Sequence, residues 1–185
     1  DLMQVLTRFG RTDVAYRLFE QDTFPSWRFS IKHGATSIWE RWDGWTPDKG
    51  FQDPGMNSFA HYSFGAVAEW MYKTIGGIDT IGPGFKRILI RPQPGGSLTR
   101  AAVAYRSING TIETKWRRDR NRFLLDVVIP ANTTARVVIP GADPAAVTEG
   151  GLPANNAIGV RFAGRVDGDA DYEIESGRYS FSSTP

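Results

Sequence analysis

The spacing of hydrophobic residues changes near residue 80, and this change constrains the fold more than any other feature of the sequence. Before residue 80, apolar residues such as Leu2, Val5 and Phe9 recur every three or four positions, which is the spacing of a helix that buries one face. After residue 80 the period is two, the spacing of a half-buried strand. The sequence therefore predicts an α + β chain in two parts, with helices in residues 1–80 and an all-β domain in residues 81–185.

Three helices are predicted in the first part. Residues 2–9 and 12–19 have the pattern of an αα-hairpin, in which Gly10 ends the first helix. The strongest helical pattern covers residues 57–77, with Asn57 as its cap. Apolar residues occupy several faces of this helix, which is typical of a helix buried in a body larger than this chain.

The second part is expected to contain short strands with a turn about every ten residues. This arrangement is typical of an antiparallel β-sandwich. Asn109-Gly110 predicts one hairpin, and a final hairpin is expected around Gly177. Strands are predicted at residues 85–91, 99–107, 111–117, 122–129, 134–139, 172–174 and 179–181.

The composition excludes several classes of protein. The 185 residues include no cysteine and two histidines, so disulfides, thiol catalysis and zinc-thiolate sites are excluded. We expect no cofactor and no metal. No apolar run approaches the ~18 residues that span a bilayer, so no membrane partner is expected. Asp167-Gly168-Asp169 resembles the start of a calcium loop but lacks the glycine and glutamate of an EF-hand, which favours a polar turn.

The net charge of +2 gives little support to nucleic-acid binding. Four arginines, at positions 117, 118, 120 and 122, lie in or beside a predicted turn at residues 119–121. No aromatic residues alternate with them, which favours a solvated turn, and no nucleic-acid partner is expected. The first residues resemble the middle of a helix and no signal peptide, which suggests a processed chain or a fragment. Cytoplasmic, periplasmic and secreted locations are all compatible with the sequence.

Residues 33–61 contain the most informative stretch of the chain. Aromatic rings alternate there with carboxylates, and both histidines lie in it. Such a mixture suits carbohydrate, because a sugar packs its apolar face on a ring while its hydroxyl groups bond to charged partners. A carboxylate among tryptophans can also act as a general acid or base. The alternative is a tryptophan-rich edge of the core whose acids pair with Arg28, Arg41 and Lys49.

The same stretch resembles the α-L-rhamnosidases of glycoside hydrolase family 78. The most specific run is Gly34-Ala-Thr-Ser-Ile-Trp-Glu-Arg-Trp-Asp-Gly44, supported by Met56-Asn-Ser-Phe59 and His61-Tyr62. The resemblance implies an (α/α)6 catalytic barrel followed by a C-terminal antiparallel β-domain. It implies that residues 1–80 are the last helices of that barrel and residues 81–185 are the β-sandwich domain.

The resemblance also implies a mechanism and its residues. Family members are inverting enzymes that cleave terminal α-L-rhamnose from glycosides, which requires two carboxyl groups on opposite sides of the scissile bond. Glu40 matches the general base, and the general acid lies upstream of this chain. His61 matches a histidine that contacts the sugar. Further residues expected to shape the site are Trp39, Trp42, Trp45 and Asp43, the last paired with Arg41 or a neighbour.

The expected partners follow from this resemblance: a rhamnose-containing glycoside and the remainder of the same enzyme, namely its upstream barrel and β-domains. One position departs from the family pattern, because Ala60 stands where an asparagine is usual. The alternative function is a non-catalytic carbohydrate-binding or structural module derived from such an enzyme. Retention of both Glu40 and His61 argues against that alternative.

Overall fold

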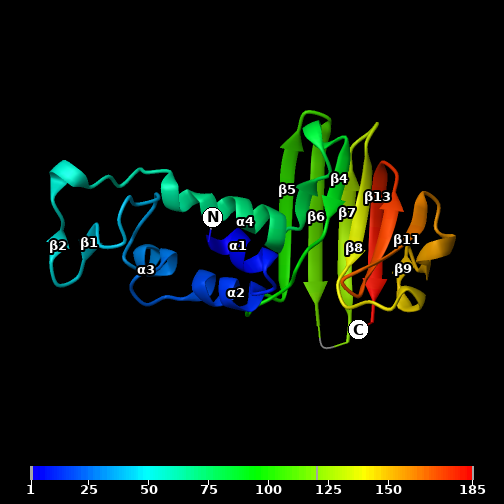
Figure 1. Cartoon of the computed structure of the whole chain (residues 1–185), viewed down its shortest axis with the longest axis horizontal. Coiled ribbons are helices and arrows are strands. Elements are labelled where there is room, and N and C mark those ends of the chain that lie inside the picture. Colours follow the sequence, from blue (N-terminus) through cyan, green and yellow to red (C-terminus); the bar gives the residue numbers. More distant parts are fainter. Residues whose placement is uncertain (1, 120, 185) are drawn as a thin grey trace. The chain divides into compact units, whose positions relative to one another are not determined.

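A computed structural model describes residues 2–119 and 121–184. The chain forms two compact units, Asp1–Trp70 and Met71–Pro185. The first contains short helices and the second contains two β-sheets, so the predicted α + β class is confirmed (Figure 1). Arg120, in the predicted basic turn, lies outside the described residues. No helix among the described residues combines the length and hydropathy required to cross a bilayer.

The first two helices form the predicted αα-hairpin. Helices α1 (Leu2–Arg8) and α2 (Thr12–Glu20) are joined at Gly10, which has a φ of 73°. Trp70, in α4 (Val67–Trp70), is fully buried. Its ring packs edge-on against Tyr16 at 5.1 Å between centroids, and its Nε1 donates to the hydroxyl of Thr7 at 2.8 Å. These contacts form the core of the first unit.

The predicted helix over residues 57–77 is wrong in its first third. Residues 57–62 are not helical, and the helical pieces are η2 (Ser63–Ala66), α4 and the π-helix η3 (Met71–Ile75). The backbone of Ser58 and His61 bonds instead to residues 38–40. These longer-range hydrogen bonds outweigh the local helical spacing of the apolar side chains.

The remainder of the first unit is largely irregular. Helix α3 (Trp27–Lys32) begins where the hydroxyl of Ser26 accepts a hydrogen bond from the Phe29 amide at 3.0 Å, a common N-cap arrangement. Figure 1 shows the small β1–β2 hairpin at the opposite end of this unit from α1 and α2. The other short elements are β1 (Trp45–Thr46), β2 (Gly50–Phe51) and the 3₁₀ turn η1 (Pro54–Met56).

The second unit is a sandwich of two sheets. The six-stranded sheet has the order β10-β9-β13-β7-β6-β5, and the five-stranded sheet has the order β11-β12-β8-β4-β3. The five-stranded sheet consists of β3 (Ile78–Thr80), β4 (Arg87–Ile90), β8 (Thr134–Ile139), β11 (Val160–Val166) and β12 (Asp169–Ile174). The six-stranded sheet consists of β5 (Arg100–Ser107), β6 (Gly110–Arg118), β7 (Phe123–Ile129), β9 (Thr148–Glu149), β10 (Leu152–Pro153) and β13 (Gly177–Ser183).

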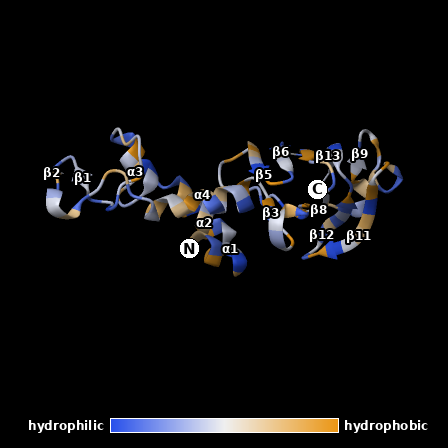
Figure 2. Ribbon diagram, turned by 90° about the horizontal axis from the view of Figure 1, so that it is seen from above, coloured by the Kyte–Doolittle hydropathy of each residue, from blue (hydrophilic) through white to orange (hydrophobic). Residues whose placement is uncertain are grey.

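Alternating side chains of the two sheets form the core. Burial alternates along β6 and β7, and Figure 2 shows both hydrophobic and hydrophilic residues in the β-strands of this unit. Tyr172 of β12 and Phe181 of β13 bring the two sheets into ring contact, at 6.0 Å between centroids. Trp116 is buried and donates from Nε1 to the Ile75 carbonyl at 2.7 Å. This bond fixes the end of η3 on β6.

Most strand predictions are confirmed, and so are two turns. Residues around Asn109-Gly110 join β5 to β6, and Asp167-Gly168 turns β11 into β12. The predicted final hairpin at Gly177 is wrong, because β12 pairs with β11 and β8, whereas β13 pairs with β7 and β9. The chain crosses between sheets there, so that Tyr172 and Phe181 cover opposite sides of one core.

One pairing departs from the antiparallel prediction. Strands β4 and β8 are parallel, with Ile88 beside Ala135 and Ile90 beside Val137. The chain leaves the five-stranded sheet after β4, builds β5, β6 and β7 in the other sheet, and returns in the original direction. Strands β3, β9, β10 and β11 were not predicted; β9 and β10 are too short to show a period.

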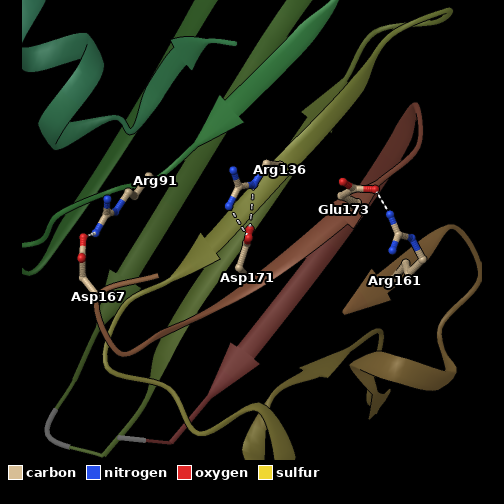
Figure 3. Close-up of polar contacts among 6 residues, drawn as sticks. All are labelled: Arg91, Arg136, Arg161, Asp167, Asp171 and Glu173. Carbon is tan, nitrogen blue, oxygen red and sulfur yellow. Dashed lines mark hydrogen bonds and ion pairs between the residues drawn. The ribbon is translucent and has the colours of Figure 1, made fainter. Parts of the chain in front are cut away.

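Ion pairs cover the outward face of the five-stranded sheet (Figure 3). Arg136 of β8 binds Asp171 of β12 through Nε and Nη2, and Arg161 binds Glu173 across β11 and β12. Arg91 binds Asp167 at 2.8 Å. The Asp171 side chain is 3% exposed, whereas those of Arg161 and Glu173 are much more exposed. The Arg136–Asp171 pair is therefore structural, and it bridges neighbouring strands.

Candidate active site

Two irregular segments of the first unit, residues 37–44 and 57–61, are cross-linked through their backbones. The amide of Glu40 donates to the Ser58 carbonyl at 2.8 Å, and the amide of His61 donates to the Ile38 carbonyl at 2.8 Å. The Ser37 hydroxyl donates to the Phe59 carbonyl. This pairing brings Glu40 and His61, which are 21 positions apart in the sequence, to the same place.

The two oxygens of the Glu40 carboxylate have different surroundings. Oε2 accepts a hydrogen bond from the Ser58 amide at 2.8 Å. Oε1 lies 4.0 Å from Nε2 of His61, beyond direct hydrogen-bond distance. The Glu40 and His61 side chains are 26% and 30% exposed. Glu40 therefore has a fixed orientation and one oxygen that can accept a proton from a third group.

The surroundings of His61 determine which ring nitrogen donates. Nδ1 accepts a hydrogen bond from the Ser63 amide at 3.3 Å, and the ring stacks on Tyr62 at 5.1 Å. A neutral imidazole that accepts at Nδ1 carries its proton on Nε2. His61 is thus oriented as a hydrogen-bond donor toward the space next to Glu40.

The three candidate tryptophans have different surroundings. Trp42 stacks on Phe64 at 3.9 Å, with an interplanar angle of 13°. Trp39 is buried and meets Phe59 edge-on at 5.3 Å. Trp45 is half-buried and lines an open pocket. Trp39 therefore braces the two segments and Trp42 joins the first of them to η2, whereas Trp45 lies at an open pocket.

Asp43 pairs with Arg41, one of the two possibilities that the sequence left open. Two parallel bonds of 2.9 Å join the Arg41 guanidinium to the Asp43 carboxylate. The hydrogen bond from Arg41 holds the pKa of Asp43 below its usual range. A carboxylate with a lowered pKa is a poor proton acceptor, and the two bonds to Arg41 make Asp43 part of the turn that follows Glu40.

Gly44 and Asn57 fix the two segments to each other. The Asn57 amide nitrogen donates to the Gly44 carbonyl at 2.9 Å, and a Cβ at Gly44 would lie 2.8 Å from Asn57 Oδ1. A side chain at Gly44 would therefore displace the Asn57 side chain and disturb this bond. Sequence reasoning missed the contribution of Ser58, whose backbone amide orients Glu40. A backbone donor has no side-chain signature, so a single sequence contains no signal for it.

Two protein-family models and a curated relative match this chain. The model of the bacterial alpha-L-rhamnosidase 6 hairpin glycosidase domain matches residues 1–75, and that of the bacterial alpha-L-rhamnosidase C-terminal domain matches residues 77–152. An alpha-L-rhamnosidase of Streptomyces avermitilis is 45% identical over 181 residues, which are 98% of this chain and 17% of that protein. The chain resembles the C-terminal part of the α-L-rhamnosidases.

Solved α-L-rhamnosidases have the same fold. The crystal structure of the Streptomyces avermitilis enzyme, complexed with L-rhamnose, superposes with a TM-score of 0.89 at 44% identity, over 98% of this chain and 17% of that one. The α-L-rhamnosidase from Dictyoglumus thermophilum gives 0.84 at 31% identity, over 99% of this chain and 20% of that one. The chain thus spans about a fifth or less of the α-L-rhamnosidases it matches. Among its described residues, no cluster of three or more histidine, aspartate or glutamate side chains could hold a metal ion.

Proposed function

We propose that this chain is the C-terminal part of an inverting α-L-rhamnosidase of glycoside hydrolase family 78, and that it contributes the general base, Glu40. The observation that carries the proposal is the Glu40 carboxylate itself. Ser58 holds Oε2, and Oε1 is left open beside a histidine that donates from Nε2. The similarity to α-L-rhamnosidases supplies the substrate class, terminal α-L-rhamnose in glycosides.

The reaction proceeds by a single displacement. A water bound to Oε1 of Glu40 loses a proton to that oxygen as its own oxygen attacks C1 of rhamnose. The bond from C1 to the leaving oxygen breaks, and a general acid outside this chain protonates that oxygen. Because the water attacks from the face opposite the leaving group, the sugar is released as the β-anomer. The Ser58 amide keeps Oε2 in place, so the open oxygen points at the water throughout.

The neighbouring side chains bind the sugar. His61 donates from Nε2 to a hydroxyl group of rhamnose, and the aromatic rings around Glu40 exclude bulk water. Asp43 acts through Arg41, by holding the turn after Glu40 in shape. The catalytic role belongs to Glu40 alone among the described carboxylates of this unit.

The remainder of the site comes from the upstream barrel and β-domains of the same enzyme. We assign residues 1–80 to the end of the (α/α)6 barrel and residues 81–185 to the C-terminal β-domain. The matches to two rhamnosidase domains, over residues 1–75 and 77–152, support this division. The curated and solved relatives are several times longer than this chain, which supports a larger complete enzyme.

The stereochemistry of the first product tests the proposal. The complete enzyme that contains this chain is mixed with an aryl α-L-rhamnoside, and the anomeric proton of the released sugar is followed by NMR before mutarotation. We expect β-L-rhamnose to appear first. Initial release of the α-anomer would overturn the inverting mechanism, and absence of hydrolysis by the complete enzyme would overturn the rhamnosidase assignment.

A further inference from the structure

The outward face of the five-stranded sheet in the second unit is hollowed. The hollow has a volume of about 610 Å³ and crosses the neighbouring strands β4, β8, β12 and β11. Glu40 and His61 of the candidate active site do not line it. We call its polar lining residues the sheet-face site: Arg87, Thr134, Arg136, Arg161, Glu173 and Glu175.

The strand register places the charged side chains of this site on one side of the sheet. Arg136 lies opposite Glu173, and Glu173 lies opposite Arg161. Residues directly opposite each other on neighbouring strands project to the same face. Arg87 stands two positions before Leu89, which lies opposite Arg136, so Arg87 projects to this face as well. Figure 3 shows Arg136, Arg161 and Glu173 on this face.

Arg87 is the arginine of the site that has no carboxylate partner. Arg136 bonds to Asp171, and Arg161 bonds to Glu173. Arg87 is exposed, and its guanidinium makes no hydrogen bond or ion pair with any residue that the structure describes. A guanidinium without a partner is free to bind a carboxylate of a ligand through two parallel N–H bonds.

The two paired arginines keep donors for a ligand, because a guanidinium carries five N–H groups. Arg136 uses Nε and Nη2 on Asp171, and Arg161 uses Nη2 on Glu173, so Nη1 of both has no partner in the described part of the chain. The Arg136 side chain is 35% exposed, whereas that of Asp171 is 3% exposed. The buried carboxylate thus fixes a guanidinium that solvent still reaches, which lowers the entropy cost of binding a ligand there.

The glutamates of the site restrict the class of ligand. Glu173 and Glu175 repel a polymer whose polar groups are mainly sulfates, but their carboxylates accept hydrogen bonds from hydroxyl groups. Among the described residues that line the hollow, none is phenylalanine, tyrosine or tryptophan, so a neutral sugar finds no ring to stack on. A ligand that carries both carboxylates and hydroxyl groups matches both kinds of side chain. Uronic acids, which are sugars with one carboxylate, have this combination.

The width of the site indicates a chain of sugars as the ligand. Neighbouring strands of a sheet lie ~4.8 Å apart. Arg87 in β4 and Arg161 in β11 are separated by three such intervals, which is roughly 14 Å. One sugar ring does not reach both arginines, whereas a short run of linked uronic acids does.

We propose that the sheet-face site binds a run of uronic acids in a polysaccharide. Arg87 and the spare donors of Arg136 and Arg161 bind the carboxylates, and Glu173 and Glu175 accept hydrogen bonds from the hydroxyl groups. The inference rests on the proposed function in one respect: an enzyme that removes rhamnose from glycosides gains from holding a polymeric substrate at a second place. The binding itself uses no residue of the candidate active site, so the two proposals can be tested separately.

Calorimetric titration of the complete enzyme with tetragalacturonate tests the site. This probe has a carboxylate on every ring and contains no rhamnose. We expect Arg87→Ala to raise the Kd about 5- to 10-fold, the usual effect of losing one charge-assisted contact at an exposed position. Arg87→Lys, which keeps the charge but loses the two-pronged geometry, should fall between the two. Saturating L-rhamnose should leave the Kd unchanged, and both variants should hydrolyse an aryl α-L-rhamnoside at the unmodified rate.

Arg100→Ala is the matched control, because it removes the same charge from an exposed arginine of β5 in the other sheet. It should leave the Kd unchanged. An equal loss in Arg100→Ala and Arg87→Ala would show attraction to positive charge in general, and would overturn the site. Displacement of the probe by L-rhamnose would place it in the active site and would overturn the proposal as well.

Two further probes test the selectivity for uronic acids. The methyl ester of tetragalacturonate lacks the carboxylates, and a tetraglutamate peptide lacks the sugar hydroxyl groups; both should bind more weakly than tetragalacturonate. Equal binding of either probe, or no binding of tetragalacturonate by the unmodified enzyme, overturns the sheet-face site and leaves the proposed function standing. If tetragalacturonate binds as expected but the enzyme hydrolyses no rhamnoside, the proposed function fails while the site stands.

Discussion

Glu40 and Ser58 are bonded to each other twice. The Glu40 amide donates to the Ser58 carbonyl, and the Ser58 amide donates to Oε2 of the Glu40 carboxylate, each at 2.8 Å. The first bond places the backbone of Glu40 and the second orients its side chain. A residue fixed at both levels points its remaining oxygen in one direction, which is what a general base requires.

Glu40→Gln in the complete enzyme should lower kcat by about 10²- to 10⁴-fold, because the amide still accepts the Ser58 bond but cannot take the proton from water. KM should change little. The decisive measurement is azide rescue of Glu40→Gly, in which azide enters the space left by the side chain and attacks C1 to give a β-rhamnosyl azide.

Asp43→Asn and Asp53→Asn are the matched controls for that experiment. Arg41 occupies the Asp43 carboxylate, and the Asp53 carboxylate accepts a hydrogen bond from the Gly55 amide at 2.8 Å. Asp53→Asn should keep kcat within a few-fold of the unmodified enzyme, and Asp43→Asn, which loosens the turn after Glu40, should lower kcat far less than Glu40→Gln does. If either one abolishes turnover while Glu40→Gln remains active, the base is another carboxylate.

The sequence indicates which segments carry the candidate site, but it does not predict how those segments pair. The tryptophans, Glu40 and His61 identify the segments, and the Arg41–Asp43 pair is close enough in sequence to be anticipated. The pairing of those segments was not predictable, because it depends on hydrogen bonds between residues about 20 positions apart. For the same reason the helical spacing of residues 57–62 was misleading.

In the β-domain, too, the local elements were predictable from the sequence and the pairing of distant strands was not. The period of two located the long strands, and Asn109-Gly110 located a hairpin, because both are local patterns. The partner of each strand depends on the whole fold. Residues 172–174 and 179–181 look like the two arms of a hairpin around Gly177, yet they belong to different sheets.

The separate 185-residue chain should not hydrolyse an aryl α-L-rhamnoside. Without a general acid the leaving oxygen is not protonated, a loss of about 10²- to 10⁴-fold by itself, and part of the sugar site is also missing. The measurement is the release of the aryl alcohol by the purified chain, compared with the complete enzyme at equal molar concentration. Comparable rates would mean that the acid lies within these 185 residues.

Arg136→Met should destabilise the chain much more than Arg161→Met. The first change leaves the Asp171 carboxylate buried without its partner, which typically costs about 3–5 kcal/mol. The second removes an exposed pair with Glu173, a change of at most about 1 kcal/mol. Urea unfolding of the three proteins gives both free energies of unfolding. Equal effects would show that water reaches Asp171.

Gly77→Ala should be among the most damaging small changes in the second unit. Gly77 has a φ of 75°, and a Cβ there would lie 2.2 Å from the backbone nitrogen of Pro92. Backbone strain and this clash together should lower the free energy of unfolding by about 3 kcal/mol or more. Gly168→Ala is the control, because its φ of 90° adds the strain without any neighbour within 4 Å. It should cost about 1–2 kcal/mol, and an equal loss at both positions would contradict the clash.

Tyr172→Phe should make the chain less sensitive to alkaline pH. Burial between the two sheets raises the pKa of the Tyr172 hydroxyl above its usual value, and the Asp143 carboxylate adds to the shift. In the unfolded chain a tyrosine loses its proton near pH 10, earlier than in the folded chain. The stabilisation is therefore complete below about pH 10 and is lost as the pH rises through the folded value.

Urea unfolding at several pH values from 8 to 11 measures this effect. Phenylalanine cannot ionise, so the decline in the free energy of unfolding above pH 10 should be shallower for Tyr172→Phe. Loss of the bond from the Tyr172 hydroxyl to the Pro144 carbonyl, 3.3 Å long, should lower stability by about 1 kcal/mol at all pH values below 10, so the slopes are compared. Tyr105→Phe, at a residue that is 36% exposed, is the matched control for loss of a hydroxyl from a more exposed tyrosine. If the slope of Tyr172→Phe is also unchanged, Tyr172 ionises as readily in the folded chain as in the unfolded one.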